Sequence, residues 1–427
     1  LHLSLRRQRQ MCIRDRMYPI NRHLRRNYMA AALDKIKVVD LTRTLAGPFC
    51  TMLMGDMGAE VVKIEEPSNG DETRHWTPFV NGESTQFLTF NRNKRSLSVN
   101  LKEPEGIKIV QDLAAEADVM IESFRAGTLD RLGLGYEAIK KLNPGLVYCS
   151  ISGYGRTGPM SDMPGYDLLI QAYSGLMSLT GDPEGTPLRI GFSLVDLFTG
   201  MMAYGTILTA LRQKDQTGEG QWVESALLDG QVAALSYHAT GFMGTGVEPK
   251  RMGSGHPSLV PYQSFNSSNG QFIIGCANQG LWERMCAAIG HPQMVDDPRY
   301  ITNTDRVEHR SECVGELNAI FATNTTSHWV DLIVGAGVPC GPINTVSEVV
   351  SNPQVLARNM IATVDHPKVP ELKFPGSPLK LSNSPASIRR VPPLLGQHNE
   401  EVLGEAGYSE DQIADLIARG VIGGNGK

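Results

Sequence analysis

The sequence has 427 residues, 41% of them hydrophobic and 20% charged. These are ordinary values for a globular protein, and the length favours two domains over one small core. Seven cysteines without a CxxC spacing and ten histidines without an HExxH pattern argue against a disulfide framework and a metal site, so we expect a reducing compartment and no metal.

A basic tail begins the sequence. Residues 1–32 hold eight arginines, no lysine and one acid, Asp15. Without them, 32 basic and 44 acidic residues remain, a net charge of −12, which argues against nucleic-acid binding. The tail fits translated upstream sequence, a transit peptide or a disordered arm, and we favour the first for residues 1–16. We expect a cytoplasmic protein, with the mitochondrial matrix as the alternative.

Strands and helices then alternate as far as residue 152. Apolar runs predict strands over 36–41, 59–65, 97–101, 118–124 and 146–152. Helical patterns that begin near Gly47, Pro104 and Gly127 lie between them. This alternation predicts a large Rossmann-like α/β domain with a parallel sheet.

A glycine motif follows the last of these strands. Gly153, Gly155 and Gly158 have the GxGxxG spacing of a dinucleotide-binding loop. Pro159 and Pro164 follow directly and no helical period begins there, whereas the dinucleotide motif needs a helix at this point. The motif is therefore weak support for a nicotinamide-dependent oxidoreductase.

Asp196 is the only charged residue between Arg189 and Arg212. An isolated carboxylate in an apolar setting costs free energy, so it points to a chemical or structural use. The structural alternative is a helix N-cap, and Thr199 follows three residues later. A membrane span is disfavoured because hydroxyl residues and glycines interrupt the apolar run.

The second half of the chain differs in character. Asn269-Gly270 between two apolar runs predicts a β-hairpin, helical stretches follow it, and prolines are frequent after residue 366. After the tail over residues 1–32 we expect four parts. The N-terminal part of the large domain covers 33–212, and a linker covers 213–225. A smaller α+β domain follows over 226–337, and a segment over 338–427 returns to the large domain.

Eight segments are informative when they are taken together: 40–48, 58–65, 70–76, 91–96, 129–133, 165–167, 337–342 and 392–398. In this order they resemble the class III CoA-transferases of the CaiB/BaiF type, which include formyl-CoA and carnitine CoA-transferases. The resemblance covers about residues 34–425 and is strongest to the succinate–hydroxymethylglutarate (glutarate) branch.

The resemblance implies that Asp196 is the catalytic nucleophile. It would attack an acyl-CoA thioester to give a mixed anhydride, and the released thiolate would convert this into an aspartyl-CoA thioester. The loop Gly253-Ser254-Gly255 matches the family's glycine loop near the reacting carbonyl, although an ordinary turn is the alternative. No cofactor is implied beyond coenzyme A as a co-substrate.

The resemblance also assigns binding residues. Asp167 would line the site or, alternatively, cap the helix that follows it. Arg43 and Arg74 are suited to a substrate carboxylate, with surface ion pairs as the alternative, and Trp76 to an acyl-pocket wall or the core. The residues expected to contact CoA are Arg43, Ala46, Lys94, Lys102, Phe124 and Arg131.

The implied activity is transfer of CoA from an acyl-CoA, such as succinyl-CoA, to a dicarboxylate such as glutarate or hydroxymethylglutarate. The rival functions are an α-methylacyl-CoA racemase, in which a histidine stands where this chain has Tyr166, and a non-catalytic CoA-binding protein. The family also implies an interlocked homodimer, with no membrane or nucleic-acid partner.

Overall fold

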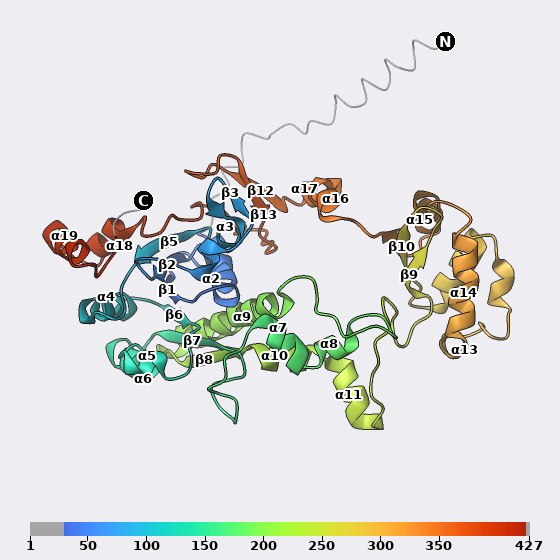
Figure 1. Cartoon of the computed structure of the whole chain (residues 1–427), viewed down its shortest axis with the longest axis horizontal. Helices are drawn as coiled ribbons and strands as arrows, with labels where there is room; N and C mark the ends of the chain where they lie inside the picture. Colours follow the sequence, from blue (N-terminus) through green and yellow to red (C-terminus); the bar gives the residue numbers. More distant parts are fainter. Residues whose placement is uncertain (1–29, 424–427) are drawn as a thin grey trace, which may run out of the picture.

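A computed structural model describes residues 30–423 of the chain, so most of the expected basic tail lies outside the described residues. Its largest sheet has six parallel strands in the order β5-β2-β1-β6-β7-β8. Figure 1 shows this sheet between helices on both faces. The strands are β1 (Lys37–Leu41), β2 (Glu60–Glu65), β5 (Lys94–Ser98), β6 (Val119–Glu122), β7 (Val147–Ser152) and β8 (Trp222–Ala226).

The helices of the large sheet pack on it through two apolar cores, one on each face. One core includes residues of α2 (Ala46–Asp56), α7 (Asp167–Tyr173), α9 (Leu194–Thr217) and α10 (Leu227–Ala234). The opposite core includes residues of α4 (Pro104–Ala115), α5 (Thr128–Arg131) and α6 (Tyr136–Leu142). The shorter elements of this half are η1 (Glu72–His75), β3 (Phe79–Val80), β4 (Glu83–Ser84), α3 (Thr85–Phe90), α8 (Leu176–Leu179) and α11 (Ser236–Thr245).

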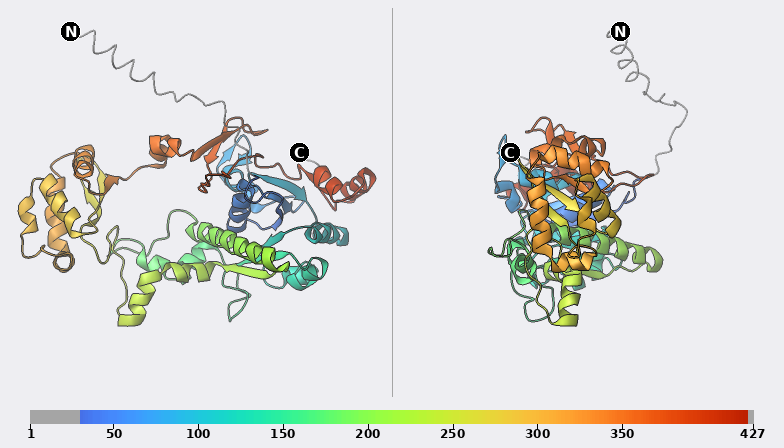
Figure 2. Two further views of the ribbon diagram at one scale, coloured as in Figure 1. Left: turned by 180° about the vertical axis from the view of Figure 1, so that it is seen from behind. Right: turned by 90° about the vertical axis from the view of Figure 1, so that its right-hand side faces the viewer.

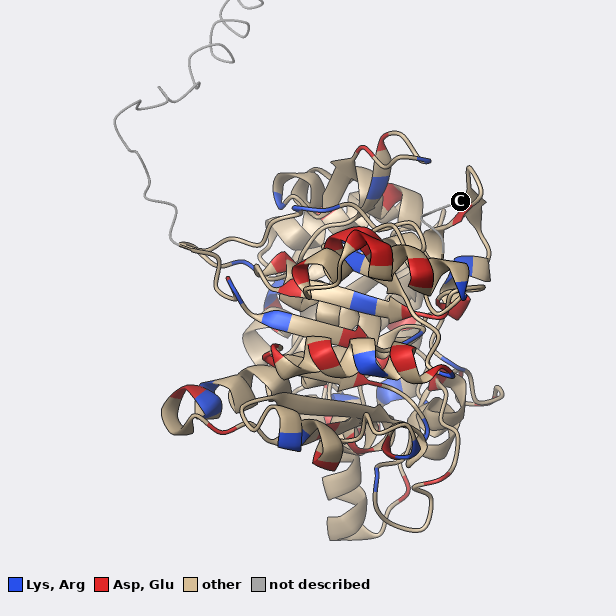
Figure 3. Cartoon of the chain, turned by 90° about the vertical axis from the view of Figure 1, so that its left-hand side faces the viewer, with Lys and Arg blue, Asp and Glu red and all other residues tan. Residues whose placement is uncertain are grey.

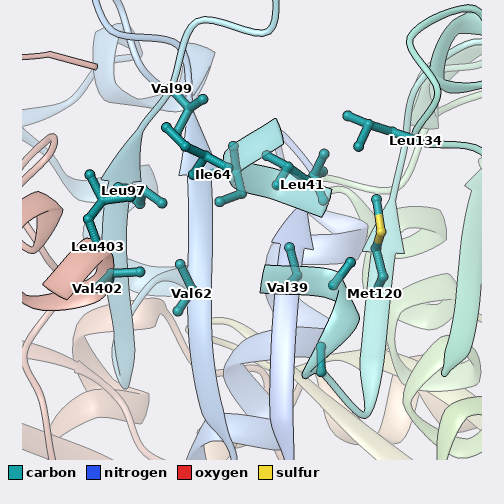
Figure 4. Packing of buried hydrophobic residues seen from close by; sticks show 14 of the residues in the cluster. Val39, Leu41, Val62, Ile64, Leu97, Val99, Met120, Leu134, Val402 and Leu403 are labelled. Atoms are coloured by element: carbon teal, nitrogen blue, oxygen red, sulfur yellow. The ribbon is translucent and has the colours of Figure 1, made fainter. Parts of the chain in front are cut away.

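The alternation of side chains along the strands separates the two cores. On β1, Val39 and Leu41 face the α4 side, together with Val62 and Ile64 of β2 (Figure 4). The residues between them, Asp40 on β1 and Lys63 on β2, point to the α2 side and are fully buried there. Buried charged residues thus lie beside the apolar core on the α2 side of the sheet.

Two predictions about local structure were wrong. The third strand is Lys94–Ser98 rather than 97–101, because Lys94 and Arg95 are buried in the sheet with charged partners. The expected linker over 213–225 is instead the last turn of α9, which ends at Thr217, and the edge strand β8.

A third apolar core, separate from the two on the large sheet, lies between Val260 and Val338. It is built on the antiparallel sheet β9 (Tyr262–Asn266), β10 (Gln271–Gly275) and β11 (Cys340–Pro342), and Asn269-Gly270 joins the first two strands as predicted. Its helices are α12 (Gln279–Ala288), η2 (Pro292–Val295), α13 (Asn303–Glu308), α14 (Arg310–Phe321) and α15 (Thr326–Gly335). Two chain segments connect this unit to the rest of the molecule (Figure 2).

The C-terminal part packs back on the large sheet. It contains α16 (Val346–Ser351), α17 (Pro353–Ala357), the hairpin β12 (Ile361–Val364) with β13 (Leu372–Pro375), α18 (Asn399–Glu405) and α19 (Glu410–Ala418). Val402 and Leu403 of α18 enter the core on the α4 side. Acidic and basic residues are mixed over this end of the molecule (Figure 3), and Arg95 of β5 pairs with Glu405 at 2.7 Å.

Helix α9 is long and apolar enough to cross a membrane, by length and composition alone. In the structure it packs against α2, α10, β7 and β8. Val195, Ala203, Ile207 and Ala210 of this helix lie in the core, whereas Met201 on the same helix is exposed, so α9 packs on the sheet through one face.

Candidate active site

A cavity of about 320 Å³ lies at the carboxyl ends of the central strands. The chain proceeds from β1 to β2 and β5 on one side, and β6, β7 and β8 lie on the other, so the strand order reverses between β1 and β6. Open parallel sheets bind ligands at such a switch point. The cavity is lined mainly by segments 43–47 after β1, 123–126 after β6, 151–153 at the end of β7 and 163–166, together with Asp196 and Leu227.

Asp196 is the third residue of α9 and lines this cavity. Ser193 occupies the N-cap position, so the alternative role of Asp196 as the N-cap is wrong. Within residues 30–423, we find no hydrogen bond to the Asp196 carboxylate. Its side chain is therefore available to a ligand.

Asp167 caps α9 from a neighbouring helix. Ser193 makes no side-chain capping bond, and the Asp167 carboxylate instead accepts hydrogen bonds from the backbone N–H of Val195 (2.9 Å) and of Asp196 (3.4 Å). Gln171, one turn along α7, also donates to Asp167 at 2.6 Å. Asp167 is the first residue of α7, so the alternative that it caps this helix is wrong. Asp167 is buried and does not line the cavity; it positions Asp196 instead.

The electrostatic setting of Asp196 favours its neutral form. Burial, followed by the nearby charge of Asp167, raises the pKa of Asp196 from its usual 3.8 to about 7. A carboxylate that ionises near neutral pH in a poorly hydrated site is a candidate for chemistry. It is weakly solvated once ionised, which suits a nucleophile.

The start of α2 lies beside Asp196 because two helices approach closely. Gly200, one turn after Asp196, lies against the Ala46 carbonyl, and a Cβ added to Gly200 would stand 2.5 Å from that oxygen. Helix α2 begins at Ala46 without a side-chain cap. The first N–H groups of a helix have no acceptor within it, so those of Ala46 and Gly47 are suited to an oxyanion at the cavity.

Three of the other residues predicted from the sequence line the same cavity: Arg43, Ala46 and Phe124. Arg43 is exposed, and its guanidinium lies over the Phe124 ring at 5.0 Å. Its backbone N–H donates to the Ser123 hydroxyl at 3.1 Å, which ties the loop after β1 to the loop after β6. No ion pair of Arg43 is found among the described residues.

Lys94 does not fit its predicted contact with CoA. Its side chain has no solvent exposure, and its ammonium donates to Asp40 (3.2 Å) and to the Pro48 carbonyl (2.9 Å). Burial is the main influence on the pKa of Lys94, which is lowered to about 8. An ammonium enclosed in this way cannot reach a CoA phosphate without a change of fold, so Lys94 is a structural residue here.

Arg74 likewise has a structural partner rather than an open guanidinium. It forms two hydrogen bonds of 2.7 Å with the buried Glu65 carboxylate and lies 3.6 Å above the Phe87 ring. Its third partner is the Pro393 carbonyl at 3.2 Å. Arg74 is therefore in an ion pair, but a buried one rather than the surface pair expected as the alternative, and its use for a substrate carboxylate stays a prediction.

The remaining predicted residues lie outside the cavity. Trp76, Lys102 and Arg131 are exposed, and their predicted contacts with the acyl group or CoA stay predictions. In the predicted glycine loop, the Gly253 N–H donates to the Gly181 carbonyl (3.0 Å), and the Ser254 hydroxyl pairs with that of Ser264 (2.6 Å). The loop does not line the cavity around Asp196 in the single chain.

Sequence reasoning missed two arginines at the cavity. Arg125 is exposed between Phe124 and Ala126, and no ion pair of its side chain is found among the described residues. Arg156 is nine-tenths buried and pairs with Glu122 at 2.5 Å, whereas its Nε atom has no partner among those residues. Arg125 directly follows the matched Phe124, which is the signal that would have found it. Within residues 30–423 we find no cluster of three or more His, Cys, Asp or Glu side chains able to hold a metal.

Comparison with known proteins gives consistent results. Residues 33–399 match the family model of CoA-transferase family III. The chain is 45% identical over 392 residues to the succinyl-CoA:glutarate CoA-transferase of Mus musculus, covering 91% of this chain and 90% of the relative. It is 39% identical to the succinate–glutarate CoA-transferase of Agrobacterium fabrum, covering 87% and 95% of the two chains.

A solved structure has the same fold. The crystal structure of a CaiB/BaiF family protein from Brucella suis superposes with a TM-score of 0.80 at 38% identity, and the match covers 88% of this chain and all of that one. The resemblance deduced from the eight motifs is therefore confirmed. The chain belongs to CoA-transferase family III.

Proposed function

We propose that this enzyme transfers CoA from succinyl-CoA to a dicarboxylate of five or six carbons, with Asp196 as the nucleophile. The observation that carries the proposal is the Asp196 carboxylate, without a partner among the described residues, in the cavity at the switch point of the sheet. The substrates are those in the names of the mouse and Agrobacterium relatives. The cavity also offers a free Arg43, whose planar guanidinium is suited to the second carboxylate of a dicarboxylate.

The reaction proceeds as two exchanges at one carboxylate. Ionised Asp196 attacks the thioester carbonyl, the C–S bond breaks, and CoA thiolate leaves behind a mixed anhydride. The thiolate attacks the Asp196 carbonyl of this anhydride, which releases the donor acid and forms an aspartyl-CoA thioester. The acceptor carboxylate displaces the thiolate from Asp196, and the thiolate then attacks the acceptor's acyl carbonyl. This gives the new acyl-CoA and restores the Asp196 carboxylate, with no net change of oxidation state.

The oxyanion of each tetrahedral intermediate needs hydrogen-bond donors in place before the reaction. The uncapped start of α2 supplies them in this proposal, through the N–H groups of Ala46 and Gly47. The positive end of the helix dipole stabilises the same charge. The loop 253–255 does not line the cavity in the single chain, so its predicted place near the reacting carbonyl stays a prediction.

We also propose that the active protein is a homodimer. Large apolar side chains are exposed on α7, α9 and α11, including Tyr173 of α7 (59% exposed), Met201 of α9 (52%) and Met243 of α11 (76%). Soluble monomers seldom expose many such side chains together, so a second copy of the chain is the expected cover. Analytical ultracentrifugation tests this: a single species with the mass of one chain would contradict it.

The decisive assay incubates the purified protein with succinyl-CoA and glutarate and follows glutaryl-CoA by mass spectrometry. Formation of glutaryl-CoA supports the proposal. A parallel incubation of a 2-methylacyl-CoA in deuterated water tests the racemase alternative, and deuterium at the α-carbon without CoA transfer would overturn the proposal.

Trapping identifies the nucleophile. Hydroxylamine added during turnover should convert the acylated side chain to a hydroxamate on the peptide that contains Asp196. Asp215→Asn, on the exposed end of the same helix, is the matched control and should be trapped at position 196 like the wild type. A hydroxamate on any other residue would refute the assignment.

A further inference from the structure

The turn between β1 and α2 contains a strained residue at the rim of the cavity. Thr44 has a φ of +70°, in the left-handed region that β-branched residues rarely adopt. Such a conformation persists only where the surroundings hold it, and it is typical of functional sites. Residues 43–47, which include Thr44, line the cavity that holds Asp196.

Side chains clamp this turn at three successive amides. The Thr42 N–H donates to Asp40 (2.9 Å), the Arg43 N–H to Ser123 (3.1 Å), and the Thr44 N–H to both carboxylate oxygens of Asp71 (3.3 Å each). The turn is therefore anchored residue by residue from three different elements. The contact from Asp71 acts on the strained residue itself.

Lys63 connects Thr42 at the start of the turn with Asp71, which holds Thr44. Its ammonium donates to the Thr42 carbonyl at 2.8 Å and pairs with the Asp71 carboxylate at 2.8 Å. Neither Lys63 nor Asp71 has any side-chain exposure. A buried ion pair is a poor way to gain stability, because removing two charges from water costs about as much as their attraction returns. This one is placed where it fixes a backbone conformation.

The position of the turn matters for the reaction because it directs both Arg43 and the start of α2. Arg43 is the middle one of the three clamped residues, and Ala46 follows the turn directly. Ala46 in turn lies against Gly200, one turn of α9 from Asp196. A turn that relaxed out of the left-handed conformation would move the oxyanion donors and the Arg43 guanidinium relative to the nucleophile.

We propose that Lys63 and Asp71 are positioning residues for CoA transfer, which hold Thr44 in its strained conformation so that the cavity is formed before the substrate binds. The proposal rests on the CoA-transferase function described above. Lys63 and Asp71 contact the turn and do not line the cavity, so they act through residues 42–44.

The test compares two buried ion pairs at opposite ends of α2. Asp71→Asn removes the charge beside the start of the helix, and Asp56→Asn removes the matched charge at its end, where Asp56 pairs with the buried Arg92 at 2.7 Å. Both variants should unfold at lower temperature. Only Asp71→Asn should lower kcat/KM for succinyl-CoA, by at least tenfold, and weaken the binding of free CoA measured by calorimetry. Equal catalytic losses in both variants, or none in either, would overturn the proposal.

Rescue separates positioning from general damage. Glycine adopts a positive φ without the cost that a β-branched residue bears, so adding Thr44→Gly to Asp71→Asn should restore part of the lost kcat/KM. If the double variant had the same kcat/KM as Asp71→Asn, strain at Thr44 would not explain the loss. If Asp71→Asn does not fold, Lys63→Met combined with Asp71→Leu removes both charges; wild-type kcat/KM in that folded variant would refute the proposal. Wild-type protein that binds CoA without transferring it would instead refute the proposed function.

Discussion

Two carboxylates near the same cavity have opposite properties. Burial opposes ionisation of Asp71, but the adjacent charge of Lys63 outweighs it and lowers the pKa of Asp71 to about 2. Burial also opposes ionisation of Asp196, and there the nearest charge is another carboxylate, Asp167, so its pKa rises to about 7. Burial alone therefore does not decide what an acidic residue does; its charged neighbour does. The paired carboxylate accepts hydrogen bonds from the Thr44 N–H, and the unpaired one lines the cavity.

The largest expected effect comes from removing the unpaired carboxylate. Asp196→Asn keeps the size of the side chain but cannot form an anhydride, so kcat should fall by about 1,000-fold or more. The measurement is glutaryl-CoA formation at pH 8. In the wild type, kcat/KM should rise with pH through about 7, as Asp196 ionises. A variant with more than about a tenth of wild-type activity would mean that another residue is the nucleophile.

The next largest effect is expected from moving α9, which carries Asp196, away from the start of α2. Gly200→Ala would place a Cβ 2.5 Å from the Ala46 carbonyl oxygen, so α9 must move away from α2. We expect a loss of about 1–3 kcal/mol in unfolding free energy. A displacement of about 1 Å between nucleophile and oxyanion donors should also lower kcat by up to about 100-fold. Gly205→Ala, on the same helix with no atom within 4 Å of the added Cβ, is the control and should have neither effect.

A smaller effect distinguishes the two arginines that sequence reasoning treated alike. Arg43→Met should raise KM for glutarate about tenfold or more, since it removes a free guanidinium from the cavity. Arg74→Met should mainly lower stability, by about 3–5 kcal/mol, because it leaves the Glu65 carboxylate buried without its partner. Steady-state kinetics and thermal unfolding of both variants measure this. If Arg74→Met raised KM for glutarate and Arg43→Met did not, Arg74 rather than Arg43 would bind the substrate carboxylate.

The sequence predicted those features that a single segment determines. Apolar strands separated by helical patterns indicated the parallel sheet. An isolated charge in an apolar run singled out Asp196, which lines the cavity, and its role as nucleophile stays a prediction. The pairing of Lys63 with Asp71 is not visible in this way, because it depends on how the chain turns after β2. The same limitation explains the misplaced third strand: Lys94 looks like a loop residue until its partner Asp40, 54 positions earlier, is known. The edge strand β8 was taken for part of a linker because the polar run 213–220, which contains Gly218 and Gly220, precedes it.

The smallest effect concerns stability and sharpens the comparison of the two carboxylates. The pKa of Asp196 is about 7 in the folded chain, against 3.8 for an ordinary aspartate. Between these two pH values the folded chain binds a proton that the unfolded chain releases, so this contribution stabilises the fold at low pH and is lost as the pH rises through 7. Asparagine does not ionise, so the Tm of Asp196→Asn should fall less than that of the wild type between pH 5 and pH 8. The difference between the two falls in Tm should be on the order of 2–4 °C.

The contribution of Asp71 to stability should depend on pH in the opposite direction. Its pKa is lowered to about 2, so its contribution is present above about pH 4 and is lost only as the pH falls towards 2. Thermal unfolding of wild type, Asp196→Asn and Asp71→Asn at several pH values between 3 and 8 separates the two cases. The Asp71→Asn variant should be destabilised by nearly the same amount at pH 5 and pH 8, because Asp71 is ionised in the wild type at both. If the Tm difference between Asp196→Asn and the wild type did not change over this range, Asp196 would not titrate near neutrality, and the contrast with Asp71 would have to rest on hydrogen bonding alone.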